Sequence, residues 1–275
     1  MDTQQIVESL SYITWALLGS VALGGFALAW LLRQTTEVTT GFVGFSAFLA
    51  GFIGLLWLFS ELSLPLPSEL AIEPASDLDE ARRATIGLFT LLAFVAAFRQ
   101  RRGGTGLWVG GLAILAGILA MGLGAWGWSG QSSLAASLLV HLLAMAAVTG
   151  GSVTAVVLAH WYLVTPGISE RPLVLTTQLL MVALVIQVLL FFSWQAAGIP
   201  SGEPFEALSG DNAIFVWLRL TVGLLFPLVL TYMAYRTAQT RSMESATGLL
   251  YIELAAVLAS TIVAAGLVFA EGLLV

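Results

Sequence analysis

The hexapeptide RATIGL at residues 83–88 returns as RLTVGL at residues 219–224, and this repetition decides the predicted fold. Three further matches keep the same order along the chain: GSV at 19–21 and 151–153, FS then PS at 59–68 and 192–201, and TGL at 105–107 and 247–249. Each match is short, but all four are in register with only small insertions. We therefore interpret residues 1–130 and 131–275 as two copies of one ancestral unit.

The composition is that of an integral membrane protein. Hydrophobic residues make up 59% of the chain and charged residues only 9%, whereas a soluble domain carries roughly 25% charged residues. Apolar stretches of about 20 residues, enough to cross a bilayer as a helix, recur along the whole length. The chain has no cysteine and no lysine. These absences exclude thiolate metal sites, thiol catalysis and lysine Schiff bases.

We predict an all-α integral membrane protein with eight transmembrane helices. Their approximate ranges are 9–32, 41–60, 84–98, 105–127, 133–164, 172–195, 213–235 and 246–270. Each copy supplies four helices, an even number, so the two tandem four-helix bundles share one orientation and are related by an axis along the membrane normal. Pro227 inside the seventh helix lacks a backbone donor and predicts a kink there. Arg219 and its counterpart Arg83 are both expected to end a helix at the membrane surface.

Arginine placement predicts the orientation, because loops on the cytoplasmic side are enriched in basic residues. With both termini outside, seven of the ten arginines lie in or beside the inner loops: Arg33, Arg99, Arg101, Arg102, Arg171, Arg236 and Arg241. The two long acidic loops, at about 61–82 and 196–212, then face outward. We predict a multi-pass protein of the inner (cytoplasmic) membrane. The expected partners are the lipid bilayer and other subunits of a membrane complex, and not nucleic acid.

Ionisable and polar groups at membrane depth are costly and usually functional. Most of the candidates fall in the second copy: His141 and His160 on the fifth helix, Gln178 on the sixth, and Glu253 on the eighth. The counterpart of Glu253 in the first copy is Gly111. This difference between the copies predicts that the first is a scaffold and that the second carries the site.

A quinone site is the first functional hypothesis. The helix rise of about 1.5 Å per residue places His160, Gln178, Tyr232 and Glu253 at one inner level. A quinone needs a hydrogen-bond donor at each carbonyl, which His160, Tyr232 and Gln178 offer, and a proton relay, which Glu253 offers. The favoured function is therefore a membrane subunit of an electron-transfer complex that binds quinone in the second bundle. The sequence leaves open whether the chain is itself an enzyme.

Haem b binding is the less favoured cofactor hypothesis, with His160 or His141 as iron ligand. The two histidines are about 28 Å apart along one helix, so they cannot share an iron. Histidine–methionine pairs remain, His160 with Met233 or His141 with Met121, and Arg219 could receive a propionate.

Two further hypotheses stay open. The chain could be a proton-coupled secondary transporter that uses Glu253 and His160, or a scaffold without chemistry. A structural interpretation of His160 competes with all of these, because the histidine stands beside Trp161 and Tyr162, where an interfacial aromatic belt is expected.

Overall fold

The computed structural model describes residues 3–66, 70–71, 76–102, 107–130, 132–199 and 203–275, and within them it contains helices and no β-strand. Eight helical segments of this described part are long and apolar enough to cross a membrane. The predicted number of helices is therefore confirmed.

The first four long helices are α1 (Thr3–Thr35), α2 (Thr40–Leu62), α3 (Asp79–Arg101) and α4 (Leu107–Trp128), with a short 3₁₀ turn, η1 (Ser76–Leu78), before α3. The second half begins with α5 (Ser132–Val164) and α6 (Arg171–Ala197), followed by the 3₁₀ turn η2 (Glu206–Leu208). The seventh apolar segment is divided into α7 (Ala213–Leu220), a π-helical turn η3 (Thr221–Leu225) and α8 (Phe226–Gln239). The last helix is α9 (Met243–Glu271).

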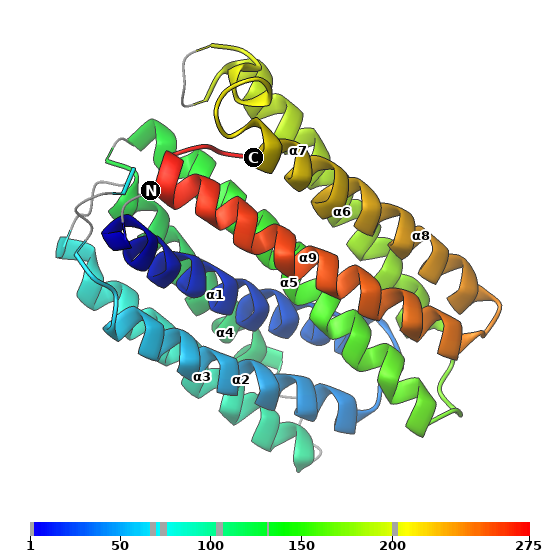
Figure 1. Ribbon diagram of the computed structural model, residues 1–275. Coiled ribbons are helices and arrows are strands. Elements are labelled where there is room, and N and C mark those ends of the chain that lie inside the picture. Colours follow the sequence, from blue (N-terminus) through cyan, green and yellow to red (C-terminus); the bar gives the residue numbers. More distant parts are fainter. Residues whose placement is uncertain (1–2, 67–69, 72–75, 103–106, 131, 200–202) are drawn as a thin grey trace.

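The helices run roughly side by side, with α1 and α5 at the centre (Figure 1). On one side α2 packs against α1 and α3, and α3 packs against α4. On the other side α6 packs against α5 and α8, while α9 packs against α5 and α8. The two sets are joined mainly by α1 against α5, and further by α1 against α9 and α4 against α5.

Glycines bring the backbones of α1 and α5 into direct contact. A Cβ atom added at Gly24 would lie 1.7 Å from the carbonyl oxygen of Ala146, and one added at Gly150 would lie 2.2 Å from the amide nitrogen of Gly25. Thr154 Oγ1 donates a 3.1 Å hydrogen bond to the Gly25 carbonyl at the same crossing. Small residues of this kind allow close helix approach where lipid provides no hydrophobic drive between helices.

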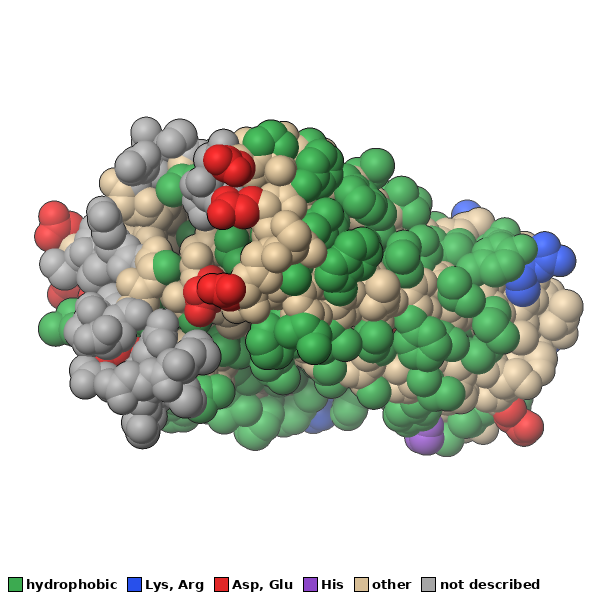
Figure 2. All heavy atoms as spheres, turned by 45° about the horizontal axis from the view of Figure 1, so that its top comes forward, with side chains coloured by type: hydrophobic (Ala, Val, Ile, Leu, Met, Phe, Trp, Pro, Cys, Tyr) green, Lys and Arg blue, Asp and Glu red, His purple; other side chains and the backbone are tan. Residues whose placement is uncertain are grey.

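Charge is distributed unevenly between the two ends of the molecule. The N- and C-termini lie toward the same end (Figure 1). Acidic side chains gather at the left end in Figure 2 and arginine side chains mainly at the right end, with an apolar surface between them. The arginines of the last turns of α1, α3 and α8 belong to the end opposite the termini.

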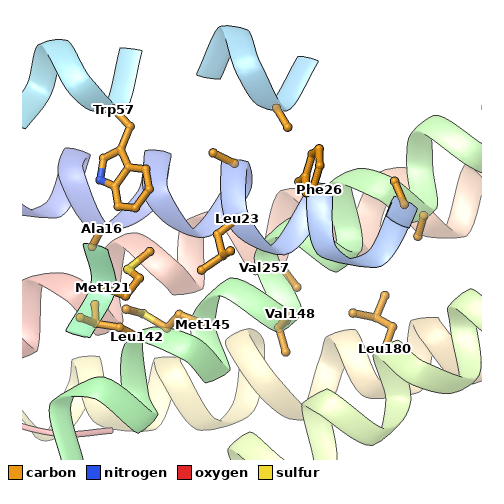
Figure 3. Packing of buried hydrophobic residues seen from close by; sticks show 14 of the residues in the cluster. Ala16, Leu23, Phe26, Trp57, Met121, Leu142, Met145, Val148, Leu180 and Val257 are labelled. Atoms are coloured by element: carbon orange, nitrogen blue, oxygen red, sulfur yellow. The ribbon is translucent and has the colours of Figure 1, made fainter. Parts of the chain in front are cut away.

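The interiors of the two halves are filled differently. Large aromatic side chains fill the first half, including the fully buried Trp15, Trp30, Trp57, Phe26, Phe42 and Phe89. Figure 3 shows Trp57, Phe26 and Leu23 in this packing, with Met121 and Met145 beside them. The interior of the second half holds many more buried polar groups: His141, Thr149, Ser152, Thr154, Thr176, Thr177, Gln187, Gln195, Arg219, Thr231, Thr247, Glu253, Ser260 and Thr261.

Two sequence predictions about helix geometry need correction. The third helix is not a short segment over 84–98, because it begins at Asp79, and Arg82 in its first turns is buried by ion pairing with Glu61. Glu61 itself belongs to the last turn of α2 and not to an acidic loop. At Pro227, where the sequence predicts a kink, the chain forms the π-helical turn η3, which ends two residues before the proline and accommodates the missing backbone donor.

Candidate functional site

Arg219 is buried inside the second half, with only 3% of its surface exposed. Its guanidinium donates from Nη1 to Ser260 Oγ on α9 and from Nη2 to Gln187 Oε1 on α6, the latter at 2.7 Å. Its Nε has no partner, and within the described residues no carboxylate lies within ion-pairing distance of it. The prediction that Arg219 ends a helix at the membrane surface is therefore wrong.

The π-helical turn explains how α7 reaches this position. The turn follows Arg219 almost at once, and a Cβ atom added at Gly223 within it would lie 2.0 Å from Ser260 Oγ. Only glycine allows α9 to come so close, and this approach brings Ser260 within reach of the guanidinium. Single π-helical turns are rare and occur frequently at functional sites.

His141 lies on α5 close to the same cluster and is 2% exposed. Its ring packs against Trp194 of α6, with centroids 5.3 Å apart. Its Nε2 has no hydrogen-bond partner. Arg219 and His141 thus each have a buried nitrogen without a partner, and no carboxylate of the described residues pairs with either side chain.

Glu253 is completely buried on α9, about 15 Å along the helix from Met243. Its Oε1 lies 2.8 Å from Ser152 Oγ on α5, and its Oε2 has no partner. The Ser152 hydroxyl also lies 2.8 Å from the carbonyl oxygen of Val148. A hydroxyl has one hydrogen, so Ser152 either shares it between the two oxygens or donates it to the Val148 carbonyl and accepts a hydrogen from a protonated Glu253 carboxyl.

A second polar contact joins the same two helices. Thr149 Oγ1 and Thr261 Oγ1 are 2.7 Å apart, and Thr261 also donates to the Val257 carbonyl. Along α9, Glu253 and Ser260 are two turns apart on one face, about 10 Å along the axis. Polar groups therefore occur at successive levels between α5, α6, α7 and α9, from the Arg219 cluster to Glu253.

The other predicted site residues lie elsewhere. His160 is exposed on the outer surface of α5, and Tyr232 of α8 is 51% exposed. Gln178 is exposed on α6, with its Nε2 3.5 Å from the Tyr235 hydroxyl. The structure does not gather these three residues around Glu253. The spacing along the sequence predicts how far along its helix each residue lies, but not the direction of its side chain.

The histidine–methionine pairs considered for haem are not brought together either. The methyl group of Met121 packs beside Gly19 and Trp57, whereas His141 packs against Trp194. Met233 is 46% exposed on α8, which packs against α6 and α9. Among the described residues, no three histidine, cysteine or acidic side chains form a group with metal-binding geometry.

Sequence reasoning missed an ionic cluster in the first half. The cluster lies at the same end of the molecule as the two termini. Glu61 is 1% exposed and accepts from Trp15 Nε1 at 2.7 Å and from Arg82 Nε at 2.8 Å. Arg82 also pairs with Asp79 at 2.8 Å, and its guanidinium carbon lies 4.8 Å from the ring centroid of Trp128. The long apolar run directly before Glu61 could have predicted that the helix continues through this residue.

Two hollows are relevant to ligand binding. A cavity of about 330 Å³ opens between α1, α4, α5 and α6, beside the Gly24 crossing, and its walls are almost entirely apolar. A smaller pocket of about 180 Å³ lies between α1, α7 and α9, where Ile13, Phe215 and Val263 form part of the wall. Neither hollow has Glu253 or Arg219 in its wall.

Comparison of the chain with protein-family models, with curated proteins and with solved structures found no match. The functional argument therefore depends on the geometry of the chain itself.

Proposed function

We propose that this chain is a multi-pass membrane protein that carries protons through the interior of its second half, as a proton-coupled secondary transporter. Glu253 is the proton-binding group, and Ser152 is the hydroxyl that exchanges a hydrogen bond with it. The arrangement of Ser152 between the Glu253 carboxyl and the Val148 carbonyl carries the proposal, because the hydroxyl can accept a hydrogen from a protonated Glu253 while it donates its own to Val148, and can donate to Glu253 once that proton has left.

The cost of burial supports a functional role for Glu253. A carboxyl group at membrane depth is unfavourable and is retained mainly along ion or proton pathways. The polar levels of α5 and α9 extend from Glu253 to the Arg219 cluster, whereas the first half has aromatic packing in its interior. This contrast supports a pathway through the second half alone.

The proposal includes the duplicated architecture and the orientation. Each set of four helices has the same neighbours in the same order, and α1 contacts α9 as α5 contacts α4. These correspondences support two tandem four-helix bundles related by an axis along the membrane normal. The excess of arginines at the end opposite the termini supports an orientation with both termini outside.

Infrared spectroscopy and proton flux together test the role of Glu253. The protein is reconstituted in lipid vesicles that contain a pH-sensitive dye, and a potassium diffusion potential drives proton movement. Wild-type vesicles are expected to show proton flux and a buried carboxylic-acid stretching band, and Glu253→Gln removes both. Glu244→Gln, at the exposed start of α9, is the matched control and changes neither. Absence of flux and of the band in the wild type refutes the proposal.

Quinone binding within an electron-transfer complex is the second candidate, and the cavity of about 330 Å³ favours it. Its apolar walls, from Leu23 on α1 to Leu180 on α6, suit the isoprenoid tail of a quinone. The test is displacement of a fluorescent quinone analogue from the purified protein, with Ala147→Trp as the variant that fills the cavity. If wild type and variant bind the analogue equally, this cavity is not a quinone site.

A further inference from the structure

Arg219 lacks the counter-charge that the buried arginine of the first half possesses. An arginine at membrane depth is costly even where snorkelling relieves part of the penalty. Arg82, the buried arginine of the first half, is paired with Glu61 and Asp79. Arg219 contacts only the neutral Gln187 and Ser260.

The sequence repeat shows where the acid was lost. The pair Phe59-Ser60 precedes Glu61, and its copy Phe192-Ser193 precedes Trp194. Trp194 therefore stands where the acidic partner stands in the first half, and it packs against His141 instead. The second half retains the buried cation but contributes no anion among the described residues.

Unused donors remain in this region. A guanidinium offers five N–H donors, and hydrogen bonds to Ser260 and Gln187 use two of them. Arg219 Nε and His141 Nε2 are both buried without a partner. A planar carboxylate matches the donor geometry of a guanidinium better than any neutral group.

The pocket of about 180 Å³ approaches this cluster from the end that carries the termini, although Arg219 itself is not in its wall. Phe215 and Val263 form part of its wall, and each lies one helical turn beyond a member of the cluster, Arg219 on α7 and Ser260 on α9. Its small volume suits a short-chain molecule. Ile13 and Leu267 help to give most of the wall an apolar character suited to a short alkyl chain, and the polar residues in the wall are Ser9, Asn212 and Glu271.

We propose that Arg219 binds the carboxylate of a short-chain monocarboxylate whose alkyl part occupies this pocket. The bound anion supplies the negative charge that Glu61 supplies in the first half. This inference rests on the proposed proton-coupled transport, for which it names the second substrate. Proton binding at Glu253 and anion binding at Arg219 are then the two coupled events.

Equilibrium binding of radiolabelled butyrate to the full chain in lipid nanodiscs tests the inference. Wild type is expected to bind butyrate saturably and to bind the neutral isostere butyramide at least about tenfold more weakly. Arg219→Gln is expected to lower butyrate affinity by about tenfold or more, and Arg219→Lys by less. Arg83→Gln is the matched control, because Arg83 is the sequence counterpart of Arg219 and its side chain is 44% exposed.

Thermal unfolding of each variant separates loss of the site from loss of the fold. The inference is overturned if folded Arg219→Gln binds butyrate as wild type does, or if butyramide binds equally well. Binding of inorganic phosphate but not butyrate, dependent on Arg219, also overturns the carboxylate class. Glu253→Gln should still bind butyrate, so a failed proton-flux test and a failed binding test point to different errors.

Discussion

Replacing Glu61 with glutamine tests whether the buried ionic cluster stabilises the first half. The substitution keeps the size of the side chain and its hydrogen bond with Trp15, but leaves Arg82 without its fully buried charge partner. Both side chains are at most 3% exposed, so solvent does not replace the lost charge. Removing one partner of a buried ion pair costs about 3–5 kcal/mol.

The partly buried Asp79 moderates this loss, since it keeps one contact with Arg82 at 2.8 Å. We therefore expect Glu61→Gln to fall near the lower end, at about 3 kcal/mol. For a chain of this size that lowers the unfolding temperature by roughly 6–12 °C. The measurement is thermal unfolding of purified protein in one detergent, followed by tryptophan fluorescence and by circular dichroism.

A double variant, Glu61→Leu with Arg82→Met, removes both charges and provides the internal control. Replacing a whole buried ion pair by apolar groups is often neutral or stabilising, so the double variant should unfold closer to wild type than Glu61→Gln does. Equal unfolding temperatures for wild type and Glu61→Gln, or a double variant less stable than the single one, would refute the argument.

Three further substitutions test individual contacts. Gly24→Ala places a methyl group 1.7 Å from the Ala146 carbonyl, so it should push α1 away from α5 and lower the unfolding temperature. The control is Gly111→Ala, whose methyl group meets nothing within 4 Å and should have a smaller effect. Equal unfolding temperatures for the two variants would contradict the close crossing. Thr149→Val removes the α5–α9 hydroxyl contact and should cost about 0.6 kcal/mol by the same assay; a loss above roughly 3 kcal/mol would mean that the contact does more than join two helices. Trp15→Phe deletes the indole donor to Glu61 and should lower the free energy of unfolding by about 1.5–3 kcal/mol. If the same substitution lowers it equally in a Glu61→Leu background, the lost hydrogen bond is not the cause.

Much of the fold was predictable because hydropathy alone locates helices that cross a membrane. All eight were found, and the start of α9 near residue 243 makes Glu253 deeper than its predicted range implied. Helix ends were less predictable. Taken alone, charged residues such as Arg82 and Glu61 are typical of loops. The ion pair between them allows both to be buried within the helices α3 and α2.

The candidate site was predicted in part. The burial of Glu253 was predictable, because an acidic residue within a long apolar run is carried into the interior with the helix that contains it. Arg219 was misplaced, since its sequence counterpart Arg83 is 44% exposed and the π-helical turn that changes the helix register has no simple sequence signal. His160 and Tyr232 were expected to face inward, but the direction of a side chain depends on helix neighbours that one sequence does not reveal.

The backbone contact between Gly24 and Gly150 has a mechanical consequence. Two helices that touch backbone to backbone near their middles cannot slide along each other or separate there without losing that fit. A tilt about this fixed point would widen the gap between α1 and α5 at one end of the helices while it narrows the gap at the other. The glycine crossing thus has the position of a fulcrum, about which a rocking of α1 against α5 would leave their separation at the crossing unchanged.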